Sequence, residues 1–293
     1  MLKIFISMEW GYFWYKVSAP YIENPLLAYS LFFLLFISVS FFYYLYLAKN
    51  RKIDNIYIRK IPALNSIDEA IGRSTEMGKP ILYIPGIMDI DNIQTLASLS
   101  ILSYVSYKCA EYETDFIMPV SRSVVMTVAQ EVVKESYLRA GRSDLYRNDM
   151  VFYLTDDQFG YAAGVDGIIS REKPGAIFLI GAFYAESLIL AETGFSAGAI
   201  QIAGTAMITQ LPFFIAACDY VLIGEELFAA SAYLSKDILD KITLKNQDIT
   251  KALVMVSVAI GAMINTIYSI YPNIANIPFI NLLHKIFQGL LIK

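Results

Sequence analysis

Two long uncharged apolar stretches flank the centre of this chain and constrain its fold more than any other feature. The first runs from Leu26 to Ala48 and the second from Ala252 to Ile270. Roughly 20 consecutive apolar residues cross a hydrocarbon core of about 30 Å as a helix. The sequence therefore predicts two transmembrane helices, with the region between them anchored to a lipid bilayer at both ends.

The composition agrees with a membrane-anchored soluble domain. Of the 293 residues, 56% are hydrophobic and 17% are charged, a balance too apolar for an ordinary soluble protein and too charged for a polytopic one. We expect an aromatic interfacial tail over residues 1–25, a transmembrane helix over 26–48, a juxtamembrane neck over 49–79, an α/β domain over 80–251, a transmembrane helix over 252–271 and an amphipathic helix over 272–293.

Basic residues gather on the inner flanks of the two stretches. They are Lys49, Arg51, Lys52, Arg59 and Lys60 after the first stretch, and Lys241, Lys245 and Lys251 before the second. Lysine and arginine near transmembrane ends favour the cytoplasmic side. We therefore expect a two-pass membrane protein whose α/β domain faces the cytoplasm.

A repeating pattern of short apolar runs and helical stretches fills the central domain. The runs cover residues 81–84, 116–118, 151–154, 176–180, 199–203 and 220–223. Continuous apolar strands that alternate with helices are typical of a parallel sheet covered on both faces. The pattern predicts an α/β fold with a doubly wound, mostly parallel sheet in a Rossmann-like three-layer arrangement.

Local signals predict where some of these helices begin and end. Asp91 with Gln94, and Thr155 with Gln158, have the spacing of capping boxes at helix N-termini. Gly141 and Gly194 are expected to stop the helices that precede them.

The candidate ligand site is the edge where the parallel strands end, because open α/β sheets bind ligands there. The residues predicted at this edge are Gly86, Asp89, Ser121, Arg122, Asp156, Gln158, Gly181, Gly204, Thr205, Gly224, Glu225 and Glu226. Helix N-termini at this edge favour an anion, and the guanidinium of Arg122 could bind it through two parallel hydrogen bonds. Each residue also has a purely structural explanation, as a turn glycine or as a carboxylate that favours a helix dipole.

Several kinds of chemistry have little support in the sequence. The only histidine, His284, lies beyond the second apolar stretch, and Cys109 and Cys218 are isolated, so neither a histidine-based nucleophile nor a zinc site is expected. No nucleotide-binding glycine motif follows a strand, and we predict no cofactor. With a net charge of −4 and no long basic run, the chain is not expected to bind nucleic acid. The pairs Asp156/Asp157 and Glu225/Glu226 leave carboxylate or metal-dependent catalysis open.

Parts of the chain resemble an uncharacterised bacterial membrane-protein family known only as a domain of unknown function. The resemblance covers roughly residues 80–251 and includes YIPGIMDIDNIQTLASLSIL, PVSR, QFGYAAGVDGIISREKPGAIFLIGAFYAESLILAETG, GAIQIAGT and QLPFFIAACDYVLIGEELFAASAYLS. It implies a protein of a bacterial cell membrane with an α/β domain. It implies no activity, cofactor or catalytic residue.

The leading functional hypothesis is structural. Residues 176–234 are more apolar than one thin domain needs, which favours a homo-oligomer formed through the α/β domain and the transmembrane helices, in a scaffold role. The alternatives are a sensor that binds a small anion or nucleotide at the strand-end edge, and a carboxylate- or metal-dependent enzyme. Gln201 and Gln210, polar residues in apolar surroundings, would either form hydrogen bonds in the core or meet another copy.

Overall fold

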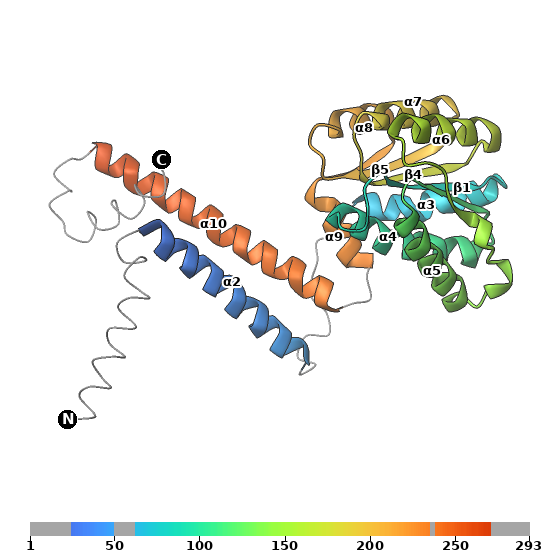
Figure 1. Ribbon diagram of the computed structural model, residues 1–293. Helices are drawn as coiled ribbons and strands as arrows, with labels where there is room; N and C mark the ends of the chain where they lie inside the picture. The colour runs from blue at the N-terminus through green and yellow to red at the C-terminus, as the bar shows by residue number, and fades with distance from the viewer. Residues whose placement is uncertain (1–24, 50–61, 235–237, 271–293) are drawn as a thin grey trace. The chain divides into compact units, whose positions relative to one another are not determined.

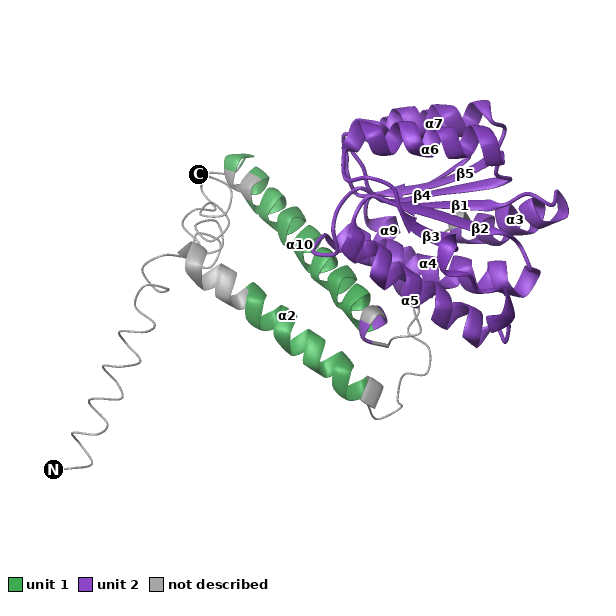
Figure 2. Ribbon diagram, turned by 45° about the vertical axis from the view of Figure 1, so that its right-hand side comes forward, with its two compact units in different colours: residues 1–56, 242–293 green, residues 57–241 purple. Residues whose placement is uncertain are grey.

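The computed structural model of the protein describes residues 25–49, 62–234 and 238–270. Residues 57–241 form one compact unit, and residues 1–56 with 242–293 form a second (Figure 2). Apart from Pro25, the aromatic tail expected over 1–25 lies outside the described residues, as does the helix expected over 272–293.

A six-stranded, all-parallel sheet forms the centre of unit 57–241. Its strands are β1 (Ile81–Gly86), β2 (Phe116–Val120), β3 (Val151–Tyr153), β4 (Ala176–Ala182), β5 (Ile200–Thr205) and β6 (Tyr220–Ile223). They lie in the order β3-β2-β1-β4-β5-β6. This order is that of doubly wound sheets with a switch point between the first and fourth strands. The predicted α/β fold with a parallel sheet is confirmed.

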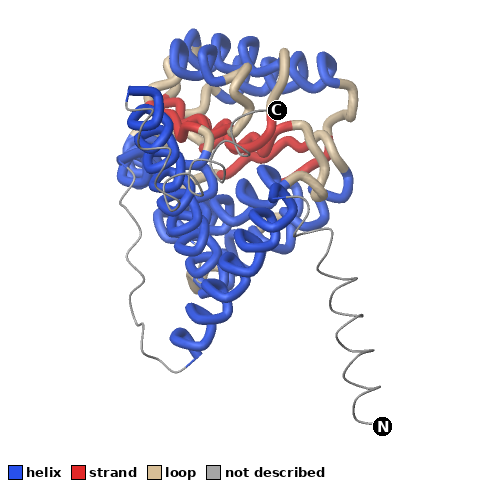
Figure 3. Tube along the Cα trace, turned by 90° about the vertical axis from the view of Figure 1, so that its left-hand side faces the viewer, coloured by secondary structure: helices blue, strands red, loops and turns tan. Residues whose placement is uncertain are grey.

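Helices cover both faces of this sheet and make the three layers that the sequence predicts (Figures 1 and 3). One face carries α3 (Pro62–Glu76), α4 (Ile93–Tyr112), α5 (Ser123–Arg139) and α9 (Glu225–Leu234). The other carries α6 (Gln158–Glu172), α7 (Glu186–Ser196) and α8 (Leu211–Ala217). Each face has its own apolar core, because every residue of β1 and β4 is buried and successive side chains alternate between the layers.

Helix α3 belongs to the α/β unit, although its residues lie in the segment expected to form a juxtamembrane neck. Its residues Leu64, Ile67 and Ile71 are buried in the same core as α4 and α5. The hydroxyl of Thr75 also pairs with that of Thr114, just before β2, at 2.5 Å. The unit therefore begins well before β1, and its first helix closes one face of the sheet.

Two of the expected helix signals are wrong in detail. The N-terminal caps are Asn92, which accepts a hydrogen bond from the backbone N–H of Gln94, and Asp157, which accepts one from Gly160. Both capping-box predictions therefore placed the cap one or two residues too early. A short side-chain oxygen that reaches a free N–H in the first turn fixes the cap, and both Asn92 and Asp157 supply one.

Of the two glycines expected to end helices, one does so and the other does not. Gly141 follows the end of α5 with a positive φ of 72°, as expected. Gly194 does not end α7, which continues to Ser196. Its missing side chain instead makes room for the amide of Gln201 on β5, which a Cβ at Gly194 would overlap. Packing between helix and sheet therefore explains this glycine.

The second unit contains two apolar helices, α2 (Pro25–Lys49) and most of α10 (Ile238–Ile270). They run side by side, and the side-chain amide of Asn246 donates to the carbonyl of Ile37 at 3.3 Å (Figures 1 and 2). Within the described residues, one helical segment is long and apolar enough to cross a membrane, Lys241–Ile264. The apolar part of α2 found by the same criteria, Phe33–Leu47, is shorter than a span. The structure thus supports one candidate transmembrane helix, and the prediction of two is not established.

Candidate functional site

The strand order reverses between β1 and β4, and the predicted site residues are spread along the carboxyl ends of the strands on both sides of this point. Folds with this strand order place ligands in the crevice outside such a switch point. Here the two strands stay in contact past their ends, since the backbone N–H of Ile87 donates to the carbonyl of Ala182 at 3.2 Å. A register irregularity between Ile84 and Gly86 accompanies this contact.

Gly86 and Gly181 make the close approach of β1 and β4 possible. Their φ angles are 84° and 148°, which side chains rarely adopt. A Cβ at Gly86 would collide with the backbone of Ala182, and a Cβ at Gly181 with the carbonyl of Pro85. The two glycines therefore lie face to face at the switch point and serve strand packing there.

Ser121 and Arg122 follow β2, and the side chain of Arg122 reaches the residue that follows β1. The Nε of Arg122 donates to the carbonyl of Ile87 at 3.1 Å, so one edge of its guanidinium fork already holds the backbone. Asp89 accepts a hydrogen bond from the N–H of Ile90 at 2.7 Å within its own turn. The hydroxyl of Ser121 is buried and has no hydrogen-bond partner among the described residues.

Gln158 forms a hydrogen bond with Glu186, a buried residue that was not among the predicted site residues. Its Nε2 donates to Oε2 of Glu186 at 2.5 Å, and the backbone N–H of Tyr184 donates to Oε1 at 2.9 Å. Glu186, in the first turn of α7, has no exposed surface. The sequence signal was a carboxylate inside the apolar run FYAESLILAET. Asp156, by contrast, is exposed.

The ends of β5 and β6 complete the edge. Thr205 donates from its hydroxyl to Oε1 of Gln94 at 3.2 Å, and the N–H of Ala206 donates to the same oxygen at 2.7 Å. Gly224 has a positive φ of 58° in the turn after β6, and Oε2 of Glu226 accepts a hydrogen bond from the N–H of Ile223. The other two predicted residues, Gly204 and Glu225, lie in β5 and at the exposed start of α9.

Four glutamine side chains link separate elements of the unit. Gln94 of α4 reaches β5, and Gln158 of α6 reaches α7. Gln210 accepts a hydrogen bond from the hydroxyl of Ser187 at 2.7 Å. Gln201 donates to the carbonyls of Ala191 and Ala217 at 2.9 and 3.0 Å. Both Gln201 and Gln210 thus form core hydrogen bonds, the first of the two alternatives raised by the sequence.

Burial shifts the pKa of both cysteines of the unit. Burial raises the pKa of the Cys218 thiol to about 12, with a further contribution from Asp219, and burial also raises the pKa of Cys109. Both thiols are therefore protonated at neutral pH. Within the described ranges, no three histidine, cysteine, aspartate or glutamate side chains lie close enough together to hold a metal ion. His284 lies outside these ranges.

Six large apolar side chains of α7, α8 and the loop before α8 are exposed, and together they are here called the α7–α8 surface. They are Leu188, Ile189 and Phe195 of α7, Ile208 of the loop, and Phe213 and Ile215 of α8. Phe195 is 70% exposed and Ile208 is 81% exposed. Nearby, Tyr220 and Ile223 are exposed on the edge strand β6. The sequence from 174 to 235 contains no lysine or arginine, and Glu192 is the exposed charge on α7.

Comparison with known proteins gives a family and no function. The model of a family described as a domain of unknown function (DUF6754) matches residues 23–275. Neither a curated protein nor a solved structure matches the chain.

Proposed function

The chain belongs to the family with the domain of unknown function DUF6754, and we propose that it is a membrane-anchored scaffold that self-assembles through its α/β domain. In this proposal both α2 and α10 cross a bacterial cell membrane, and the α/β unit lies on the cytoplasmic side. The basic residues that flank both apolar stretches favour this orientation. The α7–α8 surface carries the proposal.

A protein partner explains the α7–α8 surface better than a lipid surface does. Helices that lie on membranes combine apolar side chains with lysine and arginine, which attract anionic headgroups. The α7–α8 surface has no basic residue, and Glu192 would be repelled by such headgroups. Large exposed apolar areas of this kind mark protein interfaces.

A second copy of the chain is the partner that fits best. In a two-fold dimer the same surface meets itself, so every charge near the axis faces its own image. An apolar surface with a single exposed carboxylate avoids most of that repulsion. The expected assembly is therefore an isologous contact between two α7–α8 surfaces, with contacts between the membrane helices extending the complex.

The test is the mass of the full chain in a mild detergent, by light scattering or native mass spectrometry. We expect a multiple of the 32.9 kDa chain for the wild type. The double variant Phe195→Ser/Phe213→Ser removes four phenylalanines from each dimer. If each contributes half of the value for full burial, the loss is about 3–6 kcal/mol, or roughly a hundredfold to ten-thousandfold in Kd.

Leu138→Ser is the matched control, because Leu138 is 55% exposed on α5, on the opposite face of the sheet. It should leave the mass unchanged. A wild type that is monomeric at micromolar concentration contradicts self-assembly. An oligomer that survives the double variant contradicts the α7–α8 surface as the interface.

A further inference from the structure

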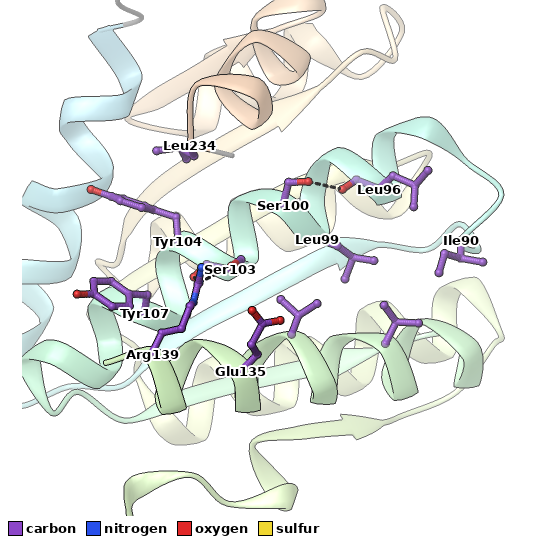
Figure 4. A pocket seen from close by; sticks show the side chains of 12 residues that line it. Ile90, Leu96, Leu99, Ser100, Ser103, Tyr104, Tyr107, Glu135, Arg139 and Leu234 are labelled. Carbon is purple, nitrogen blue, oxygen red and sulfur yellow. Dashed lines mark hydrogen bonds between the residues drawn. The ribbon is translucent and has the colours of Figure 1, made fainter. Parts of the chain in front are cut away.

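A second feature lies on the opposite face of the α/β unit, in the groove between α4 and α5. The groove holds a cavity of about 620 Å³, within the range of roughly 300–1,000 Å³ common for small-molecule sites. Its walls come from the loop before α4, from α4 and α5, and from Leu234 at the end of α9 (Figure 4). We call it the α4–α5 groove.

The groove is apolar along one part and polar at one end. Ile90, Leu96, Leu99, Val128 and Val132 supply much of the apolar lining. Figure 4 shows Arg139, Tyr107 and Ser103 together at the other end, with Glu135 beside them. The distribution is that of a site for an amphipathic molecule, with a hydrocarbon part along the strip and a polar head at Arg139.

The two charges at the polar end are held apart. Glu135 and Arg139 are four residues apart on α5, a spacing that normally favours an ion pair. Arg139 instead directs Nη2 to the hydroxyls of Ser103 and Ser136, at 2.8 and 3.2 Å, and its guanidinium lies over the ring of Tyr107. Glu135 has no hydrogen bond or ion pair with any other described residue. The groove is therefore lined by one cation and one carboxylate that do not pair with each other.

We propose that the α4–α5 groove binds a membrane lipid with a zwitterionic headgroup of the phosphatidylethanolamine type. Arg139 binds the phosphate, Glu135 binds the ammonium group, and an acyl chain lies along the apolar strip. Arg–phosphate contacts are charge-assisted, and each methylene buried contributes favourably. A free inorganic phosphate would leave the apolar strip and Glu135 unused.

The groove lies close in sequence to the candidate membrane span, which makes a bilayer lipid a suitable ligand. Leu234 lines the groove, and the candidate membrane span begins at Lys241. At most about 14 Å of extended chain separates Leu234 from Ile238, where α10 begins. Tyr104, another residue that lines the groove, donates a hydrogen bond to Asp68 of α3 at 2.7 Å. The groove is thus close along the chain to the helix that would anchor the protein in a bilayer.

Photocrosslinking of the full chain in vesicles tests the proposal. The vesicles consist of phosphatidylglycerol doped with a phosphatidylethanolamine that carries a diazirine on its acyl chain. We expect adducts on α4 and α5, in addition to those on α2 and α10 that report general lipid contact. Val132→Trp fills the strip and Leu96→Trp, at a half-exposed rim position, does so with less risk to folding. Each should lower the α4–α5 adducts roughly tenfold, the effect of losing about 1.4 kcal/mol, and leave the α2 and α10 adducts unchanged.

Headgroup recognition is tested with the same readout. Arg139→Gln should lower the α4–α5 adducts roughly tenfold, whereas Lys134→Gln, an exposed position of the same helix outside the groove, should not. A diazirine phosphatidylglycerol should label the groove less than the phosphatidylethanolamine does. Adducts confined to α2 and α10, or groove adducts that persist in both tryptophan variants, overturn the proposal. Equal labelling by the two lipids overturns the zwitterionic headgroup.

Discussion

The buried carboxylate of Glu186 offers the sharpest test of how the strand-end edge is held together. It has no exposed surface and accepts hydrogen bonds from the N–H of Tyr184 and the amide of Gln158. Glu186→Ala leaves the two donors of these part-buried hydrogen bonds without this acceptor. Each such donor costs about 1–3 kcal/mol, so the variant should lose about 2–6 kcal/mol of unfolding free energy.

The size of this effect makes it readily measurable. In a domain of about 150–250 residues, 1 kcal/mol shifts the Tm by about 2–4 °C, so Glu186→Ala should lower the Tm by about 4–24 °C. Circular dichroism of the full chain in detergent records the transition. Glu186→Gln should cost much less, because its carbonyl oxygen still accepts from Tyr184 and the amide of Gln158 turns over to present its oxygen.

Glu192→Ala is the matched control on the same helix. Glu192 is exposed, and we expect a change within about 0.5 kcal/mol. The assigned role of Glu186 is wrong if Glu186→Ala has the same Tm as the wild type, or if the alanine and glutamine variants at 186 are equally destabilised. The second outcome would mean that the charge itself, and not the pair of accepted hydrogen bonds, stabilises the edge.

Two further predictions concern α6. Asp157→Ala removes the N-cap and should cost about 0.5–2 kcal/mol in urea unfolding, whereas Asp156→Ala at the exposed neighbouring position should be nearly neutral; equal effects would contradict the assigned cap. Burial raises the pKa of Asp166, partly opposed by a hydrogen bond from Thr193. The folded state then binds the proton more tightly than the unfolded state does. The free energy of unfolding therefore falls as the pH rises from the ordinary aspartate pKa through the raised pKa of the folded state, and it stays lower at higher pH. Asp166→Asn should therefore stabilise the protein at about pH 7 and lose that gain near pH 3, below the usual aspartate pKa; a gain independent of pH would show that the charge is not its cause.

The strand-end edge shows how far local sequence signals reach. Gly86 and Gly181 were expected where strands end, and they are the last residue of β1 and the second-last residue of β4. Their close contact depends on β1 and β4 being neighbours. Thr205 was expected at the edge, but its partner Gln94 lies more than a hundred residues earlier in the chain. The binding of a ligand at this edge remains a prediction. Such a ligand would have to compete with, or bind beside, the hydrogen bonds assigned there.

The alternation of strands and helices could be read from the amino-acid pattern alone. Strands such as β4 are buried on both faces and must be apolar throughout, so they stand out as continuous runs between turns. The strand order, the burial of Glu186, the role of Gly194 and the exposure of the α7–α8 surface could not be read in this way. Each of these depends on contacts between residues far apart in the chain, and an apolar residue such as Phe195 has the same local signal whether it faces the core or the surface. Local patterns report which segments can be buried, and packing decides which of them are.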